Sequence, residues 1–164
     1  MPFRWIAALL LVASGAVCVP AVTAQTPPPY GQAISLEQAN RVIAAAAAEA
    51  DKHAWPVAIA VVDAAGYLVA FQRLENTQLG SVELAMQKAK TAALYRRPTR
   101  AFEETIAAEE TGARVLKMPD VLPVEGGLPI VHEGKLIGAI GVSGVKPTDD
   151  GKIAAAGLAA VGVK

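Results

Sequence analysis

Apolar residues recur at helical spacing between Ser35 and about Lys52, which predicts an amphipathic helix over this stretch. Ser35, followed three residues later by Gln38, has the pattern of a capping box at the start of that helix. The next segment, "PVAIAVVDAAGYLVAFQRL", is rich in apolar and β-branched residues around a turn pattern. It predicts a β-hairpin with strands at 57–62 and 67–74.

The second half of the chain predicts two adjacent helices, further strands and a last helix. Ser81 is expected to cap a helix that ends before Pro98, and Thr99 to cap another that runs to about Ala108. The segment "GGLPIVHEGKLIGAIGVSG" carries the remaining strands. A final helix is expected over 150–161.

This order of elements predicts the fold class. A helix, a hairpin, two helices, a three-stranded meander and a helix do not alternate as a parallel doubly wound sheet requires. The order favours an α/β fold of the α+β type. We expect a profilin-like or PAS-like five-stranded antiparallel sheet, with helices packed mainly on one face.

Six glycines lie between Gly126 and Gly144. Their spacing fits neither a dinucleotide-binding Gly-x-Gly-x-x-Gly loop nor a Walker loop. Gly134 belongs to a predicted two-residue hairpin turn. Gly138 and Gly141 fall inside a strand, on opposite faces of the sheet, where a glycine allows a helix or a flat ligand to come close. The sequence leaves both interpretations open.

Residues 1–24 have the pattern of a secretory signal, with a basic start, an apolar run and the small residues "VTA" before the cleavage point. Cleavage there leaves a flexible proline-rich leader at 25–34 and a single domain at 35–164. We therefore expect a periplasmic or secreted protein with no stable membrane anchor after cleavage. Cys18 leaves one alternative open, which is a lipidated N-terminus.

Composition argues against several classes of function. Removing 24 of the 164 residues leaves 140 and removes the single cysteine, so neither a disulfide nor a thiol nucleophile is expected. Lys plus Arg and Asp plus Glu number 15 each, so nothing indicates a nucleic-acid partner. No Ser–His–Asp spacing and no set of metal ligands stands out. A binding protein is favoured over an enzyme.

Three segments together resemble the GlcG/HbpS family, also known as the haem-degrading HbpS-like family and related to the C-terminal domain of PduO. These segments are "PVAIAVVDAAGYLVAFQRLENT", "SVELAMQKAKTAA", and "GGLPIVHEGKLIGAIGVSG" followed by "DDGKIAAAG". The resemblance covers nearly all of the chain after the signal. It implies a three-layer α/β/α or profilin-like fold and homo-oligomers. It also implies haem or a corrinoid as the ligand of some members.

The sequence contains two histidines, His53 and His132, and either could supply an axial donor to haem iron. His53 is expected at the end of the first helix, next to Trp55, which could stack on a porphyrin. His132 is expected beside the hairpin turn at 133–134. Either can equally be an ordinary surface histidine. The resemblance implies a histidine in the first helix of some haem-binding members, but the middle of this helix reads "QANRVIAAAA".

Lys88, Thr91 and Tyr95 share one stripe of the second predicted helix. Lys88 and Thr91 match the helix motif of the resembled family. The lysine could pair with a carboxylate or propionate, and the threonine could donate a hydrogen bond; the alternative is a partly exposed face at an oligomer interface. Arg73, on a strand near that helix, could bind an anion or serve as a charge at the sheet edge.

Three hypotheses follow from the sequence. The first is an exported oligomeric protein that binds haem or a similar tetrapyrrole, a corrinoid included, as a sensor or scavenger. Its predicted ligand-binding residues are Lys88, Thr91, Arg73, Gly138, Gly141, His53 and His132. The second is a metal-free enzyme of the lyase or isomerase type, with its pocket around Lys88. The third is a structural oligomer without a ligand.

Overall fold

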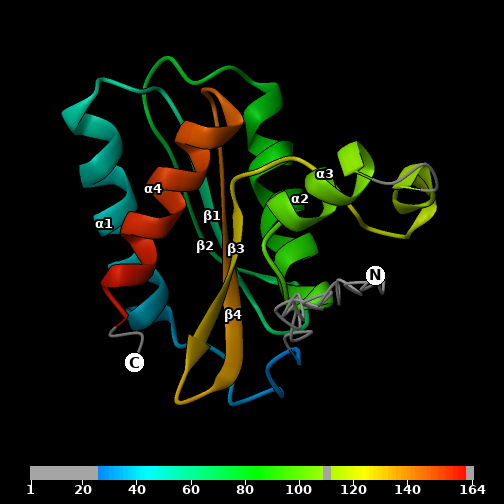
Figure 1. The fold of residues 1–164 in the computed structure, drawn as a ribbon. Helices are drawn as coiled ribbons and strands as arrows, with labels where there is room; N and C mark the ends of the chain where they lie inside the picture. Colours follow the sequence, from blue (N-terminus) through cyan, green and yellow to red (C-terminus); the bar gives the residue numbers. More distant parts are fainter. Residues whose placement is uncertain (1–25, 109–111, 162–164) are drawn as a thin grey trace, which may run out of the picture.

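The computed structural model describes residues 26–108 and 112–161, and the predicted signal with Cys18 lies outside them. Figure 1 shows helices on both sides of a central sheet. The elements in chain order are α1 (Leu36–Lys52), β1 (Ala58–Asp63), β2 (Leu68–Arg73), α2 (Gly80–Tyr95), α3 (Arg100–Ala108), the 3₁₀ segment η1 (Gly112–Lys117), β3 (Gly127–His132), β4 (Lys135–Ser143) and α4 (Pro147–Ala159).

The sheet has the strand order β2-β1-β4-β3, and all neighbouring strands are antiparallel. The predicted α+β class with an antiparallel sheet is therefore confirmed. The predicted number of strands is wrong, because the described residues form four strands and not five. After the turn at Gly134, β4 runs without interruption for nine residues. The glycine-rich segment therefore gives two strands, where the meander required three.

Helices cover both faces of the sheet, so the expectation that they pack mainly on one face is also wrong. α1 and α4 lie together on one face, and α2 lies on the other (Figure 1). The central strands β1 and β4 are buried at nearly every position, as strands covered on both faces must be. Their runs "AIAVV" and "LIGAIGV" carry that pattern in the sequence.

The two faces of the sheet have different cores. Branched residues fill the face under α1 and α4, among them Val42, Ile59, Ile140 and Ile153. The face under α2 is made almost wholly of alanine, with Ala85, Ala89, Ala92 and Ala93 of the helix packed on Ala58, Ala60 and Ala139 of the strands. Because these side chains are small, α2 packs close to the sheet. The strand positions beneath the helix therefore have no room for large side chains.

The predicted ends of the helices are partly confirmed. Ser35 caps α1, and Gln38 completes the capping box. Ser81, however, is a buried residue inside α2, because the N-cap of that helix is Leu79, two residues before the predicted cap. The last helix starts at Pro147, earlier than expected, because proline fits the first helical position.

The stretch 29–34 of the predicted leader is bound to the sheet. Tyr30 forms a parallel bridge with Leu136, and backbone hydrogen bonds join Leu136 to Pro29 and Gly31, and Ile34 to Ile137. This stretch continues the column of the sheet beyond the end of β1, beside the first residues of β4. It also forms part of the cavity described next.

Candidate functional site

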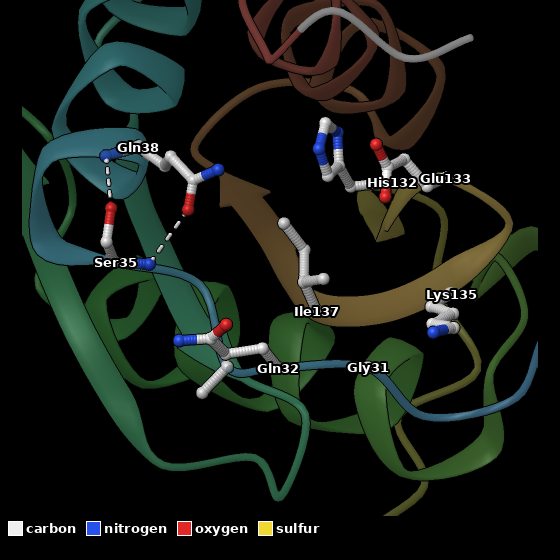
Figure 2. Close-up of a pocket in the computed structure, with 9 residues that line it drawn as sticks. Gly31, Gln32, Ser35, Gln38, His132, Glu133, Lys135 and Ile137 are labelled. Carbon is white, nitrogen blue, oxygen red and sulfur yellow. Dashed lines mark hydrogen bonds between the residues drawn. The ribbon is translucent and has the colours of Figure 1, made fainter.

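A cavity of about 440 Å³ lies between the bound leader, the start of α1 and the β3–β4 turn. Its size is in the range of small-molecule pockets. Figure 2 shows His132 and Glu133 on the strand side of the cavity and Gln38 on the helix side. The lining residues are Gly31, Gln32, Ala33, Ser35, Gln38, His132, Glu133, Lys135 and Ile137.

His132 contributes a buried imidazole nitrogen to the wall of this cavity. It ends β3, just before the turn in which Glu133 and Gly134 both have positive φ, 49° and 73°. Its Nδ1 is buried and has no hydrogen-bond partner among the described residues. An unpaired buried nitrogen is costly, so His132 carries an unmet hydrogen-bonding capacity at the cavity wall.

Among the other polar groups of the cavity, the Gln38 side chain is held in a defined place. The Gln38 side-chain oxygen accepts a hydrogen bond from the Ser35 backbone N–H at 3.0 Å, so the capping box fixes the amide at the cavity wall. Lys135 and Glu133 are exposed at the hairpin and place one positive and one negative group at the rim. The cavity therefore combines an imidazole, a cation and a carboxylate with the apolar side chain of Ile137.

His53 has a different setting at the C-terminal end of α1. Its ring stacks on Trp55, with ring centroids 4.2 Å apart, and its Nε2 lies 3.6 Å from Glu49 Oε1. A hydrogen bond from Lys52 lowers the pKa of Glu49, which keeps this carboxylate charged beside the imidazole. Trp55 lines a second cavity of about 480 Å³, but His53 is not among its lining residues.

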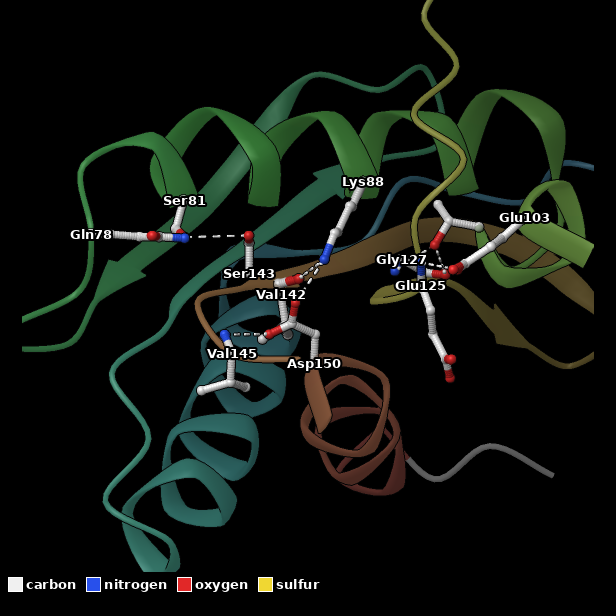
Figure 3. A network of polar contacts seen from close by, with 11 residues as sticks. Gln78, Ser81, Lys88, Glu103, Glu125, Gly127, Val142, Ser143, Val145 and Asp150 are labelled. Atoms are coloured by element: carbon white, nitrogen blue, oxygen red, sulfur yellow. Dashed lines mark hydrogen bonds and ion pairs between the residues drawn. The ribbon is translucent and has the colours of Figure 1, made fainter. Parts of the chain in front are cut away.

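Lys88 does not line an open pocket. Its side chain is 2% exposed and reaches from α2 past the end of β4 to Asp150 in the first turn of α4 (Figure 3). Nζ donates to Asp150 Oδ2 at 2.7 Å and to the carbonyl oxygen of Val142 at 3.0 Å. The helices of the two sheet faces are thus joined by one buried ion pair.

Asp150 is as deeply enclosed as its partner, at 2% exposure. Burial raises the pKa of Asp150 above its ordinary value, and the hydrogen bonds from Lys88 and from the Val145 N–H oppose this rise. Gly126, directly before β3, makes room for the two charges. A Cβ on Gly126 would lie 2.8 Å from Lys88 Nζ and 2.9 Å from Asp150 Cβ.

Sequence reasoning did not find Asp150 as the partner of Lys88. The spacing of the alanines could have indicated that Lys88 is buried, since Ala85, Ala89 and Ala92 surround it on one side of the helix. A lysine on such a small-residue stripe is buried against the sheet and requires a counter-charge. The expected partly exposed face is therefore wrong for this residue.

Thr91 and Tyr95 hold the chain that leads into β3. The Thr91 hydroxyl donates to Asp120 O at 2.8 Å and accepts from the Leu122 N–H at 2.9 Å. Tyr95 donates to Pro119 O at 2.6 Å. The stripe predicted from the sequence exists, but its Thr91 and Tyr95 hydroxyls bond the segment 119–122.

The two glycines inside β4 lie on opposite faces of the sheet, as expected. On the α2 face, a Cβ on Gly141 would overlap the carbonyl oxygen of Ala85 and lie 2.5 Å from the Ala89 nitrogen. On the other face, a Cβ on Gly138 would overlap the carbonyl oxygen of Val62 and lie 3.0 Å from Ile34 Cγ2. Protein atoms occupy both positions, so of the two interpretations the structure favours packing.

Arg73 ends the edge strand β2 and is exposed. β1 separates β2 from β4, the strand that Lys88 contacts. Lys88, Thr91 and Arg73 therefore do not form a common pocket in the structure. An enzyme centred on Lys88 would need an accessible amine, but this amine is buried and paired with Asp150.

Comparison with known proteins agrees with the resemblance found in the sequence. The model of the family described as "Haem degrading protein HbpS-like" matches residues 34–159. Protein GlcG of Escherichia coli (strain K12) is 39% identical over 110 residues, which cover 67% of this chain and 81% of GlcG.

Two solved structures share the fold. The PduOC–haem complex matches with a TM-score of 0.73 and 30% identity, covering 80% of this chain and 97% of that one. A double mutant of Streptomyces reticuli HbpS matches with a TM-score of 0.72 and 29% identity, covering 90% of this chain and 97% of that one. On the extent of the family match and the identity to GlcG, the chain belongs to the HbpS-like family.

Proposed function

We propose that the protein is an exported, oligomeric binding protein for haem or a closely related planar tetrapyrrole. Its family is described as haem degrading, and the relative PduOC has been solved with haem. The observation that carries the proposal is the buried, unpartnered His132 Nδ1 beside a cavity of about 440 Å³.

The residues of this cavity fit the parts of a haem. His132 offers the imidazole that haem proteins use most widely as an axial donor. Lys135 at the rim can pair with a propionate. Ile137 and Gly31 can contact the apolar face of the macrocycle. Haem would supply a Lewis-acidic, redox-active iron, while the protein would bind the macrocycle and limit its contact with water.

His132 suits this role better than His53. His53 is already stacked on Trp55 and lies near the charged Glu49, and its side chain is 47% exposed. A metal bound at His53 Nε2 would have to compete with the Glu49 carboxylate, 3.6 Å away. His132 has no such contact to give up at Nδ1.

A corrinoid is the second ligand that relatives suggest. The corrinoid adenosyltransferase PduO of Citrobacter freundii is 31% identical over 136 residues, but the match covers only 40% of that protein. Corrinoids and haem share a planar tetrapyrrole with a metal at the centre. The same cavity residues therefore serve both, and a binding assay must include both.

Exposed apolar side chains support the oligomeric part of the proposal. Tyr67 and Leu68 at the edge strand are 73% and 52% exposed, and Leu79 before α2 is 78% exposed. Contact between copies of the chain would remove such groups from water. Light scattering measures the subunit number, and the mass of the protein recovered outside the cytoplasm tests cleavage after residue 24.

Titration of the purified protein with haemin, followed in the visible spectrum, tests the proposed function. With haemin we expect a Soret shift that saturates at one equivalent per chain. A second titration with cobalamin tests binding of a corrinoid. A broad change that does not saturate with either compound would contradict the proposal. It would leave a ligand-free structural oligomer as the better account.

A further inference from the structure

Two neighbouring arginines follow α2 and line a third cavity, separate from the one at His132. Arg96 and Arg97 share this space of about 430 Å³ with Pro28 of the leader and with Pro98 and Ala101 at the start of α3. No residue of this cavity lines the His132 cavity. Residues 26–28 of the leader line this cavity, and residues 31–33 line the cavity at His132.

Both guanidinium groups are positioned by aromatic rings. Cζ of Arg96 lies 5.1 Å from the centroid of the Tyr30 ring, and Cζ of Arg97 lies 5.2 Å from that of Phe102. The C-cap residue Arg96 has a positive φ of 53°, so the backbone turns sharply between the two side chains. A guanidinium stacked on a ring keeps the N–H groups of its edge available for hydrogen bonds.

Neither arginine has a counter-charge among the described residues. The ion pairs of residues 26–108 and 112–161 use other cations, and Arg100 close by is paired with Glu104 and Glu125. Arg96 donates one hydrogen bond, from Nη1 to the Pro28 carbonyl oxygen at 3.2 Å. The cavity therefore has two fixed positive charges, unused N–H donors and no carboxylate in its described lining.

We infer that this cavity is a binding site for a small organic oxyanion, a carboxylate or a phosphate ester, with a short apolar body. The fork of N–H groups on an arginine matches the paired oxygens of either anion. Pro28, Pro98 and Ala101 supply the apolar wall for the carbon skeleton. The inference does not depend on the proposed haem site.

The test is a nuclear magnetic resonance titration of the purified protein with benzoate, phenyl phosphate and the neutral benzamide. We expect saturable shifts at the backbone amides of Arg96, Arg97 and Ala101 with at least one anion and none with benzamide. Binding of benzoate alone identifies a carboxylate site, and binding of phenyl phosphate alone identifies a phosphate site. No saturable shift with either anion overturns the inference.

Variants separate a specific site from general attraction to positive charge. Arg97→Ala removes an exposed side chain without touching the leader, and we expect about tenfold weaker binding, the scale of one lost charge-assisted hydrogen bond. Arg114→Ala is the matched control, because Arg114 is exposed and lies in η1 outside this cavity. Equal weakening by both variants would overturn the inference.

Discussion

Lys88 and Asp150 place a full pair of charges where water does not reach, between helices on opposite faces of the sheet. Taking both ions out of water costs more than a surface pair does, and the cost is offset only by close geometry and further hydrogen bonds. The bonds to Val142 O and from Val145 N–H supply these. The pair is thus a structural link with strict geometric demands.

Replacing Lys88 by methionine should destabilise the protein by about 3–5 kcal/mol, because a buried carboxylate loses its partner. Urea unfolding measures the change. Lys90→Met is the control, since Lys90 pairs with Asp120 at the surface and is 40% exposed, and such pairs contribute about 0–1 kcal/mol. The double variant Lys88→Met with Asp150→Leu should recover most of the loss. Equal, small effects of Lys88→Met and Lys90→Met would contradict the structural role of the pair.

Gly141 tests the close contact between α2 and β4. Alanine at this position would overlap the carbonyl oxygen of Ala85, so the helix must shift, and we expect a loss of about 1–3 kcal/mol or more. Gly80→Ala is the matched control, because an added Cβ there meets nothing within 4 Å. The free energies of unfolding of the two variants, measured by heat or urea, test this expectation. Full stability of Gly141→Ala would show that the space is larger than described.

Elements that the sequence pattern placed correctly are those whose signals are local. The capping box of α1 and the turn at 133–134 need only neighbouring residues, and both are confirmed. The side of the sheet on which each helix packs is predicted from the alternation of apolar and polar residues along the strands. Strands that are buried on both faces are apolar throughout, so their sequence does not contain this alternation. The contact between Lys88 and Asp150 spans 62 positions, so no local pattern reports it.

The leader is the element whose contacts depend most on distant parts of the chain. Its prolines predicted a flexible chain, but β4 extends beyond the end of β1, and backbone groups of 29–34 satisfy its free edge. The leader pairs with the start of β4, which lies about a hundred residues further along the sequence. The composition of the leader contains no information about that strand.

Hydrogen exchange tests this part of the structure. The amides of Gly31, Ile34 and Leu136 donate to backbone oxygens, so we expect them to exchange much more slowly than in an unfolded chain. Gln32, between two of these donors, has no such bond among those described and serves as the internal comparison. Exchange at the unprotected rate at all four positions would show that the leader is free, as its composition suggests.

At the scale of the whole molecule, the tightly packed core and the cavities beside the leader lie in different parts of the fold. The α2 face and the buried ion pair unite the layers, and they leave no open space around Lys88 and Thr91. The two cavities that the leader lines lie at the margins, where the leader meets α1 and the hairpin, and where it meets the end of α2. Of the seven ligand-binding residues predicted from the sequence, His132 is the one that lines the cavity beside the bound leader. None of the described helices is long and apolar enough to cross a membrane.

The most direct test of the account compares haemin titrations of the wild type, His132→Ala and His53→Ala. The account predicts that His132→Ala abolishes the saturable Soret shift or weakens binding at least about tenfold, the effect of losing roughly 1.4 kcal/mol. His53→Ala should titrate like the wild type, because its ring is bound to Trp55 outside the site. Normal binding by His132→Ala, with binding lost in His53→Ala, would contradict the account and place the ligand at the other end of α1.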